Sequence, residues 1–407
     1  MMNVITKDKF PQKKISSFRV ARVIKKETNK DLGFKKGEIF GSMCTTPPSF
    51  AKKILSKYVD VNLGDPGLFQ GSSEIEESAI KIVSNLLHGP NGVGTFVTGG
   101  TEANIIAIQC ALLNFLHSFI DKGLTPPQRA ELELLVPESA HFSFNKAATL
   151  LGVKLKKIGL NSSYQVDTSK LEEAITANTF AIVAIAGTTG LGTIDDIKTI
   201  SEIAKKHNLF LHIDAAFGGF VIPFMEEQFK SDNQFDFSLD GVSSITVDPH
   251  KMGQGVTPGG IILFKDKELT NHLRIDVDYL SGGKTSQLTI VGTRNGGAVL
   301  ACYSSLLNLG YDGYKKIVKR VFDVRDYFLK ELSRLSSYKL VANPTINVVG
   351  IYSTKIATNK LAKLLREKNI AVSTFSNFIR IVIMPQIKKR HIKAFVKQLK
   401  EIEENYE

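Results

Sequence analysis

The 407-residue sequence predicts an α/β fold: a mostly parallel sheet between helices, followed by a small C-terminal α+β domain. Two patterns indicate this fold. From about residue 90 to 265, continuous apolar runs alternate with segments of 3.6-residue periodicity, which is typical of parallel strands buried on both faces and joined by helices. After a glycine-rich stretch near 292–297, long helical patterns come first and two or three strand candidates follow.

We expect three parts along the chain: an N-terminal arm over residues 1–45, a large domain over 46–297 and a small domain over 298–407. A chain of this length suits two domains, because single cores stop growing at about 250–300 residues. The arm is polar and contains one short helical pattern. The strands expected in the large domain are 94–98, 132–136, 180–186, 209–213, 243–247 and 260–264, with connecting helices at 102–120 and 195–207. The elements expected in the small domain are helices at 298–308, 313–335, 357–368 and 387–403 and strands within 339–352, 370–375 and 378–385.

The composition is that of an ordinary globular protein, with 43% hydrophobic and 23% charged residues. Three scattered cysteines, Cys44, Cys110 and Cys302, are too few for a disulfide framework or a metal cluster and suit a reducing compartment. The first residues lack the apolar segment of a signal peptide, and no continuous apolar run approaches the roughly 20 residues of a spanning helix. We therefore expect a cytoplasmic protein with no membrane partner.

The formal net charge of +12 raises the alternative of a basic protein that binds nucleic acid or an anionic membrane surface. Such a protein concentrates its basic residues on one element. Here the lysines are dispersed along helices, and the C-terminal run 397–407 mixes both signs. We interpret the charge as a solvated basic surface that also favours phosphate and carboxylate ligands, and we expect no nucleic-acid partner.

Lys251 lies in the segment DPHKMGQG (248–255), directly after an apolar run. That position is the carboxyl end of a strand, where open α/β sheets bind their ligands. A loop lysine by itself is more often a solvated surface residue. Asp214 in LFLHIDAAFGG (209–219) ends another strand, and small residues follow it that allow a flat group to approach the backbone.

The carboxylate of Asp214 has three possible interpretations: a helix cap, a metal ligand, or a partner for a heterocyclic nitrogen. A metal site needs a cluster of His, Cys or carboxylate side chains, and none is near in sequence, so we predict no metal. A buried carboxylate beside a ring nitrogen keeps that nitrogen protonated, because opposite charges favour the charged form. A pyridoxal electron sink needs such a partner.

Two further segments follow apolar runs. GTFVTGGTEAN (94–104) leads through two glycines to Thr101, the expected N-cap of a long apolar helix. Unpaired amides at such a helix start form a phosphate site, and the absence of GxxxxGK[ST] and GxGxxG disfavours a nucleotide enzyme. His141 in AHFSF (140–144) is a planar ring at the same rim, suited to stacking on a cofactor.

In this order, these features closely resemble the group II pyridoxal-phosphate-dependent amino-acid decarboxylases, above all the archaeal L-tyrosine/L-aspartate decarboxylase family. Sphingosine-phosphate lyase and glutamate decarboxylase are more distant relatives. The resemblance runs from about residue 38 to 400. Its motifs are IFGSMCTTP (39–47), NLGDPGLFQG (62–71), TGGTEAN (98–104), HFSF (141–144), AGTTGLGTIDDI (186–197), HIDAAFGG (212–219), DPHKMG (248–253), DYL (278–280), VGTR (291–294) and RIVIMP (380–385).

The resemblance implies the aminotransferase-like fold type I, with a seven-stranded sheet, and pyridoxal 5′-phosphate as the cofactor. It implies that Lys251 carries the cofactor as a Schiff base. It also implies that His250 and the amides of Gly100 and Thr101 hold the phosphate. Asp248 is excluded from the phosphate contacts, because a carboxylate would repel that group, although some relatives have an amide there.

The resemblance also assigns the groups around the ring and the substrate. His141 stacks on one ring face and Ala216 lies against the other. Asp214 pairs with the pyridine nitrogen, and Thr188 lies close to that pair. Catalytic Tyr279 donates a proton to the substrate carbanion, and Arg380 binds a substrate carboxylate.

The implied reaction converts an L-amino acid to its amine and CO2. Family members use L-aspartate, which gives β-alanine for coenzyme A biosynthesis, or L-tyrosine, which gives tyramine. We expect segments 41–47 and 62–71 to line the side-chain pocket; both are polar and glycine-rich, which together with Arg380 favours aspartate. The resemblance further implies a homodimer with sites at the interface, where Tyr279 or the 291–294 turn acts in the same subunit or from the partner.

Other enzymes of the same fold are the alternatives: a carbon–carbon lyase of phosphorylated aldehydes, an aminotransferase or a cysteine desulfurase. A desulfurase needs a cysteine on a mobile loop, whereas Cys302 lies in a helical pattern and Cys44 beside a proline-rich turn. A lyase of long-chain phosphates would often carry a membrane segment. Decarboxylation is therefore the predicted reaction.

Overall fold

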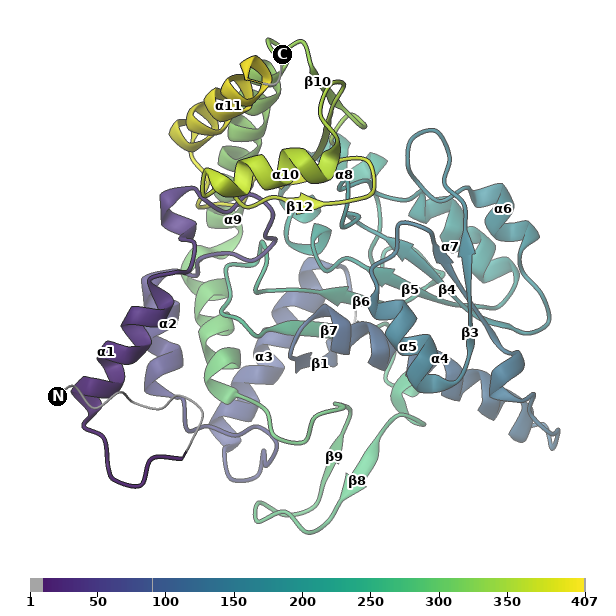
Figure 1. Cartoon of the computed structure of the whole chain (residues 1–407). Helices are drawn as coiled ribbons and strands as arrows, with labels where there is room; N and C mark the ends of the chain where they lie inside the picture. The colour runs from purple at the N-terminus through teal and green to yellow at the C-terminus, as the bar shows by residue number, and fades with distance from the viewer. Residues whose placement is uncertain (1–9, 90, 406–407) are drawn as a thin grey trace.

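The computed structural model describes residues 10–89 and 91–405 of the chain, and a seven-stranded sheet forms its centre (Figure 1). The strand order is β1-β7-β6-β5-β4-β2-β3. The strands are β1 (Val93–Val97), β2 (Glu133–Pro137), β3 (Lys154–Ile158), β4 (Thr179–Ile185), β5 (Phe210–Asp214), β6 (Val242–Val247) and β7 (Gly260–Phe264). Only β7 runs antiparallel to its neighbours, β1 and β6. The prediction of an α/β fold with a mostly parallel sheet is confirmed.

The sheet is buried on both faces, because successive residues of its strands enter different cores. In β4, Ala181 and Val183 pack with helices α4 (Gly100–Ile120) and α5 (Ser143–Leu151). The alternate residues Ile182 and Ala184 belong to the core that includes α3 (Gln70–Leu86) and α7 (Ile197–Lys206). Burial on both faces explains why these strands are continuous apolar runs in the sequence.

The six predicted strands all form, within two residues of their expected bounds, but β3 was not predicted. Its sequence KLKKI pairs with β2 alone, so β3 is an edge of the sheet. Lysines are common on edge strands, where they oppose pairing with other chains, and they break the apolar pattern. Helix α4 meets the length and hydropathy of a membrane-crossing helix, a property that a search for unbroken apolar runs misses. It packs here against the central strands, and its first half is buried.

The small domain contains a four-stranded antiparallel sheet of order β10-β11-β13-β12. Its elements are β10 (Tyr338–Leu340), β11 (Val348–Ser353), α10 (Thr358–Glu367), β12 (Ser373–Thr374), β13 (Ile379–Val382) and α11 (Lys389–Glu404). The two helices predicted before it are one element, α9 (Gly296–Leu332), broken at Gly310 by non-helical backbone with φ of 57°. Because α9 packs on α3 as well as on α11, the domain boundary at residue 297 stays a prediction.

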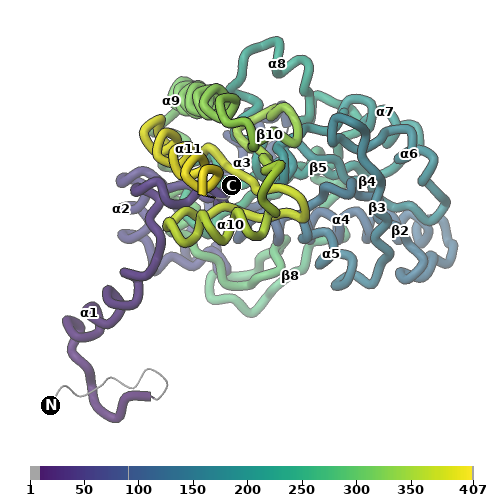
Figure 2. Tube along the Cα trace, turned by 45° about the horizontal axis from the view of Figure 1, so that its top comes forward, coloured from purple at the N-terminus to yellow at the C-terminus, as the bar shows by residue number. Residues whose placement is uncertain are grey.

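The N-terminal segment crosses to the small domain. Phe40 is buried against Phe395 of α11, and its backbone bonds to Ala371 and Val382. Helix α1 (Ser17–Thr28) lies before this crossing, has no buried residue and projects from the body (Figure 2). A hairpin of β8 (Ile275–Val277) and β9 (Thr285–Gln287) also projects (Figure 1). The remaining helices are η1 (Phe34–Lys36), α2 (Ser49–Lys57), η2 (Arg129–Glu131), α6 (Thr168–Glu173), η3 (Gly218–Phe220), η4 (Ile222–Phe224), α8 (Glu227–Asp232) and η5 (Glu268–Thr270).

Candidate active site

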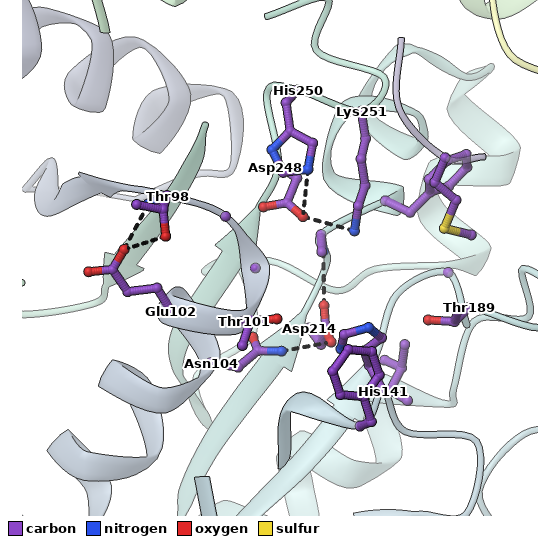
Figure 3. Close-up of a pocket in the computed structure, with 18 of the residues that line it drawn as sticks. Thr98, Thr101, Glu102, Asn104, His141, Thr189, Asp214, Asp248, His250 and Lys251 are labelled. Carbon is purple, nitrogen blue, oxygen red and sulfur yellow. Dashed lines mark hydrogen bonds and ion pairs between the residues drawn. The ribbon is translucent and has the colours of Figure 1, made fainter. Parts of the chain in front are cut away.

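Most residues that the sequence predicts for the cofactor site meet at the carboxyl ends of the parallel strands (Figure 3). Asp214 is the last residue of β5, and Lys251 follows β6 in the next turn. A cavity of about 380 Å³ lies there. Seven of the predicted residues line it: Gly100, Thr101, His141, Asp214, Ala216, His250 and Lys251. Strand ends at one edge of a parallel sheet therefore bring together residues about 150 positions apart in the chain, as expected for this fold class.

The first turn of α4 forms one wall of the cavity. Its N-cap is Gly99 rather than the predicted Thr101, and no side chain caps the helix start. Gly99 has φ of 152° and ψ of 177°, a backbone conformation essentially restricted to glycine. A Cβ at Gly100 would lie 2.9 Å from Asp248 Oδ2 and 3.3 Å from Ala216 Cβ. There is thus no room for a side chain at Gly100, and the first amides of α4 have no side-chain cap, which suits a bound anion.

Asp214 is held at the base of the cavity by hydrogen bonds from two sides. The backbone N–H of Ala216 donates to Oδ1 at 3.1 Å, and Asn104 Nδ2 donates to Oδ2 at 3.0 Å. The amide of Asn104 also contacts Ser143 Oγ at 2.9 Å and His212 Nε2 at 3.1 Å. This network links α4, α5 and β5, and it orients the carboxylate of Asp214 before any ligand binds.

Burial determines the protonation state of His212. The imidazole has no exposed surface, and burial lowers its pKa to about 4, against a smaller opposing effect of Asp214. The ring is therefore neutral near pH 7. Because Asn104 uses its Nδ2 to donate to Asp214, its Oδ1 accepts from His212 Nε2–H, which leaves Nδ1 to accept from Ser244. Asn104, Ser143 and His212 were not predicted as site residues.

Lys251 lies across the cavity from Asp214, with its ammonium 2.8 Å from Asp248 Oδ2. Burial lowers the pKa of Lys251, but the charges of Asp248 and Asp214 outweigh burial and raise it above its usual value. The Oδ1 atom of Asp248 is buried and has no hydrogen-bond partner among the described residues. The imidazole of His250 bonds through Nδ1 to the carbonyl of Gly259, so its Nε2 side faces the cavity.

His141 lines the same cavity beside Asp214 (Figure 3). Burial is the main cause that lowers its pKa, so the imidazole is neutral near pH 7, and its Nδ1 accepts a hydrogen bond from Ser143 N–H at 3.3 Å. A neutral planar ring in this position suits stacking on a flat heterocycle. Ala216 lines the cavity with a small side chain, which leaves room for one.

A second cavity of about 760 Å³ adjoins the first and shares His141 and Lys251 with it. Arg380, on β13 of the small domain, lines this larger space. Its guanidinium donates to the carbonyl of Thr189 at 2.8 Å and also to Gly41 O and Ser373 Oγ. The Nε atom of Arg380 is buried without a partner among the described residues, and burial lowers the pKa to about 10, so the group stays charged at neutral pH.

Two predicted residues do not line the cavity that holds Asp214. The hydroxyl of Thr188 bonds to Thr193 Oγ1 at 2.8 Å, and Thr188 lines the second cavity rather than the one that holds Asp214. Tyr279 lies between β8 and β9 with 84% of its surface exposed and lines neither cavity. Segment 62–71 also lies outside both cavities; Gly64 and Asp65 contact the β8–β9 hairpin.

The arrangement fits pyridoxal 5′-phosphate at each end. The uncapped start of α4 suits the phosphate, Asp214 suits the ring nitrogen, and Lys251 lies within the same cavity to bond the aldehyde carbon. The described residues contain no group of three His, Cys, Asp or Glu side chains that could hold a metal ion.

Comparison with known proteins defines the class. Residues 48–352 match the pyridoxal-dependent decarboxylase conserved domain, and the chain belongs to this family of pyridoxal-phosphate-dependent enzymes. It is a decarboxylase of amino acids with pyridoxal phosphate as its cofactor.

Individual relatives extend over nearly the whole chain. The chain is 45% identical to the L-aspartate decarboxylase of Thermococcus kodakarensis over 393 residues, covering 97% of this chain and 99% of the relative. It is 42% identical to a probable L-tyrosine/L-aspartate decarboxylase of Methanosphaera stadtmanae over 375 residues, covering 91% and 93%. The glutamate decarboxylase of Lactobacillus brevis has the same fold, with a TM-score of 0.89 at 20% identity over 98% and 94% of the two chains. The predicted fold type I is confirmed.

Proposed function

We propose that this enzyme decarboxylates L-aspartate at its α-carboxyl group and releases β-alanine and CO2. The observation that carries the proposal is the buried guanidinium of Arg380, which lines the cavity that also contains Lys251 and whose Nε has no partner among the described residues. A buried donor without a partner costs about 1–3 kcal/mol, which a bound carboxylate would recover as a charge-assisted hydrogen bond. L-aspartate has two carboxylates, one to be lost and one to be held. The relatives named as L-aspartate decarboxylases support the same substrate.

We propose the following roles for the residues that would bind the cofactor. Pyridoxal phosphate, when bound, supplies the electron sink for the pair left by departing CO2. Lys251 would bind it, with Gly100, Thr101 and His250 around its phosphate and Asp214 keeping its ring nitrogen protonated. These roles apply the predicted assignments to the observed geometry.

On the substrate side, Arg380 would orient the amino acid by the carboxylate that is retained. His141 and Ala216 would fix the plane of the reacting group from its two faces. Tyr279 would return a proton to the substrate Cα. Apolar side chains in the second cavity, such as Leu191 and Val341, would limit water around the carboxylate that leaves.

L-tyrosine is the second candidate substrate, and one observation favours it. Phe375 and Phe378 line the same cavity as a stacked pair, with ring centroids 4.7 Å apart and planes 2° from parallel. A phenol ring could pack against such a wall. The two substrates are distinguished by incubating the holoenzyme with L-aspartate, L-tyrosine and L-glutamate in turn and quantifying CO2 and the amine.

We expect kcat/KM for L-aspartate to exceed that for L-tyrosine by at least about 100-fold, because the phenol of L-tyrosine carries no charge to pair with the Arg380 guanidinium and would leave its Nε–H without an acceptor. Arg380→Met should raise KM for L-aspartate by about 10–150-fold, the loss of one charge-assisted hydrogen bond. Arg325→Met is the matched control, since Arg325 donates to the carbonyl of Ile346 and lines neither cavity. Tyramine as the preferred product, or equal effects of the two variants, would contradict the proposal.

We further propose a homodimer whose partner completes each site. The support is a set of exposed apolar side chains: Leu68, Ile275, Tyr279 and Ile290 lie on the hairpin or on the segments next to it, and Phe50 and Val59 lie on and just after α2. Exposed apolar residues of this size and number commonly mark an interface. Tyr279 would then reach the cavity of the other subunit.

A complementation experiment tests this arrangement. Lys251→Ala and Tyr279→Phe homodimers are each expected to have impaired activity. In a mixed dimer, the intact Lys251 of one chain would receive the intact Tyr279 of the other. Activity recovered on subunit exchange supports action from the partner, whereas no recovery in a mixed dimer places Tyr279 in its own subunit. We also propose a cytoplasmic enzyme whose β-alanine is used for coenzyme A.

A further inference from the structure

Asp248 has a contact that the cofactor chemistry does not require. Its carboxylate is 1% exposed and lies at the end of β6, three residues before Lys251. Oδ2 accepts from the ammonium of Lys251 at 2.8 Å, while Oδ1 has no hydrogen-bond partner among the described residues. The same carboxylate lies beside the start of α4, where we expect the cofactor phosphate, since a Cβ at Gly100 would lie 2.9 Å from Oδ2. A carboxylate there opposes anion binding, so its presence needs another explanation.

We propose that Asp248 is a positioning residue that holds the free ε-ammonium group of Lys251 on the side of the cavity opposite Asp214 and thereby makes cofactor capture slow at neutral pH and faster as pH rises. An ammonium group has three donors, whereas a lysine nitrogen joined to the cofactor has at most one N–H. Asp248 therefore stabilises the free lysine more than the bonded one. Because Asp248 is buried directly after β6, its carboxylate fixes the position of Lys251 Nζ before the cofactor binds.

The charges around Lys251 agree with this role. Asp248 and Asp214 both face the ammonium, His141 faces it as a neutral ring, and Cys44 lies near. His250 Nε2 is 3.9 Å from Asp248 Oδ2, the same oxygen that contacts Lys251 (Figure 3). The pKa of Lys251 is raised because the two carboxylates outweigh burial. Asp248 is the only one of these groups within hydrogen-bond distance of Nζ among the described residues.

Capture requires the neutral amine. The ammonium releases one proton to solvent, the lysine nitrogen bonds the aldehyde carbon, and the aldehyde oxygen leaves as water. Below the lysine pKa, the neutral fraction falls tenfold for each pH unit. Each unit by which a variant lowers that pKa thus accelerates capture about tenfold at a fixed lower pH.

The test mixes the cofactor-free full-length protein with pyridoxal phosphate, or with deoxypyridoxal, which lacks the phosphate, from about pH 6 to 9. Capture is followed by visible absorbance, with no amino acid present, so the result does not depend on the proposed substrate. Asp248→Asn should accelerate capture of both aldehydes about tenfold or more at pH 7 and move the pH profile to lower pH. Asp236→Asn is the matched control, a buried acid that pairs with His88 outside the cavity.

An unchanged pH profile in Asp248→Asn overturns the proposal. Acceleration with pyridoxal phosphate alone also overturns it, because the carboxylate would then act on the phosphate and not on the lysine. If the variant does not fold, the wild-type profile decides: the proposal requires a rate that rises throughout this pH range, and a plateau that begins below pH 9 contradicts it.

Discussion

A substitution at Gly99 tests most sharply whether the start of α4 binds the cofactor phosphate. The φ of 152° and ψ of 177° at Gly99 lie in a region of backbone conformation that costs a non-glycine residue about 1–3 kcal/mol. An added Cβ would also approach His250 Cε1 at 3.1 Å. Gly99→Ala should therefore lower the free energy of unfolding by about 1–3 kcal/mol and turn the first amides of α4 away from the cavity. The loss of one charge-assisted hydrogen bond then weakens cofactor binding by about 10–150-fold.

The assay is a cofactor titration of the cofactor-free protein by visible absorbance, together with urea unfolding. Gly123→Ala is the control, because Gly123 has φ of 70°, no neighbour within 4 Å of an added Cβ and no place in the cavity. It should lower stability without changing cofactor affinity. Equal cofactor affinity in Gly99→Ala and wild type would refute the assignment of the phosphate to the start of α4.

Three further outcomes follow from the buried groups. The folded-state pKa of His212 is about 4 against 6.5 unfolded, so the stability that its neutral form contributes is complete above pH 6.5 and is lost as pH falls towards 4. Urea unfolding should show up to about 3 kcal/mol of this loss in wild type and none of it in His212→Gln. Glu76→Gln should lower the free energy of unfolding by more than the about 1 kcal/mol typical of a surface pair, because the half-buried Arg294 loses its charged partner at 2.5 Å and keeps only neutral acceptors such as Leu63 O. A loss below about 1 kcal/mol would show that the pair is solvated. Asp214→Asn should lower the pKa of the bound pyridine nitrogen by about 1–3 units, as measured by a pH titration of holoenzyme absorbance. An unchanged titration would show that Asp214 does not pair with that nitrogen.

The sequence predicts the sheet well wherever burial on both faces produces continuous apolar runs. It fails at β3, where an edge position permits lysines on both sides of the strand. It predicts two helices in place of α9, and the break between them does occur, at Gly310. Patterns of apolar residues in the sequence thus predict a strand or helix correctly where its burial is the same along its whole length.

The meeting of the predicted residues at one cavity was predictable, because each lies at or after the end of a strand and strand ends meet in parallel sheets. The support of Asp214 was not, because Asn104, Ser143 and His212 become neighbours only through packing of α4 on the sheet. A hint existed in the composition of their segments: polar residues within otherwise apolar helix and strand patterns indicate buried hydrogen bonds. The proposed contact of Tyr279 with a partner subunit depends on assembly, which patterns within one chain do not contain.

We propose that the site at Lys251 removes the α-carboxyl group of L-aspartate. The most direct measurement incubates the holoenzyme with L-aspartate labelled with carbon-14 at C1 or, separately, at C4. All released CO2 should carry the C1 label, and β-alanine should form in equal molar amount and retain the C4 label. CO2 released from C4, a keto acid as the product, or full activity in Lys251→Ala would contradict the account.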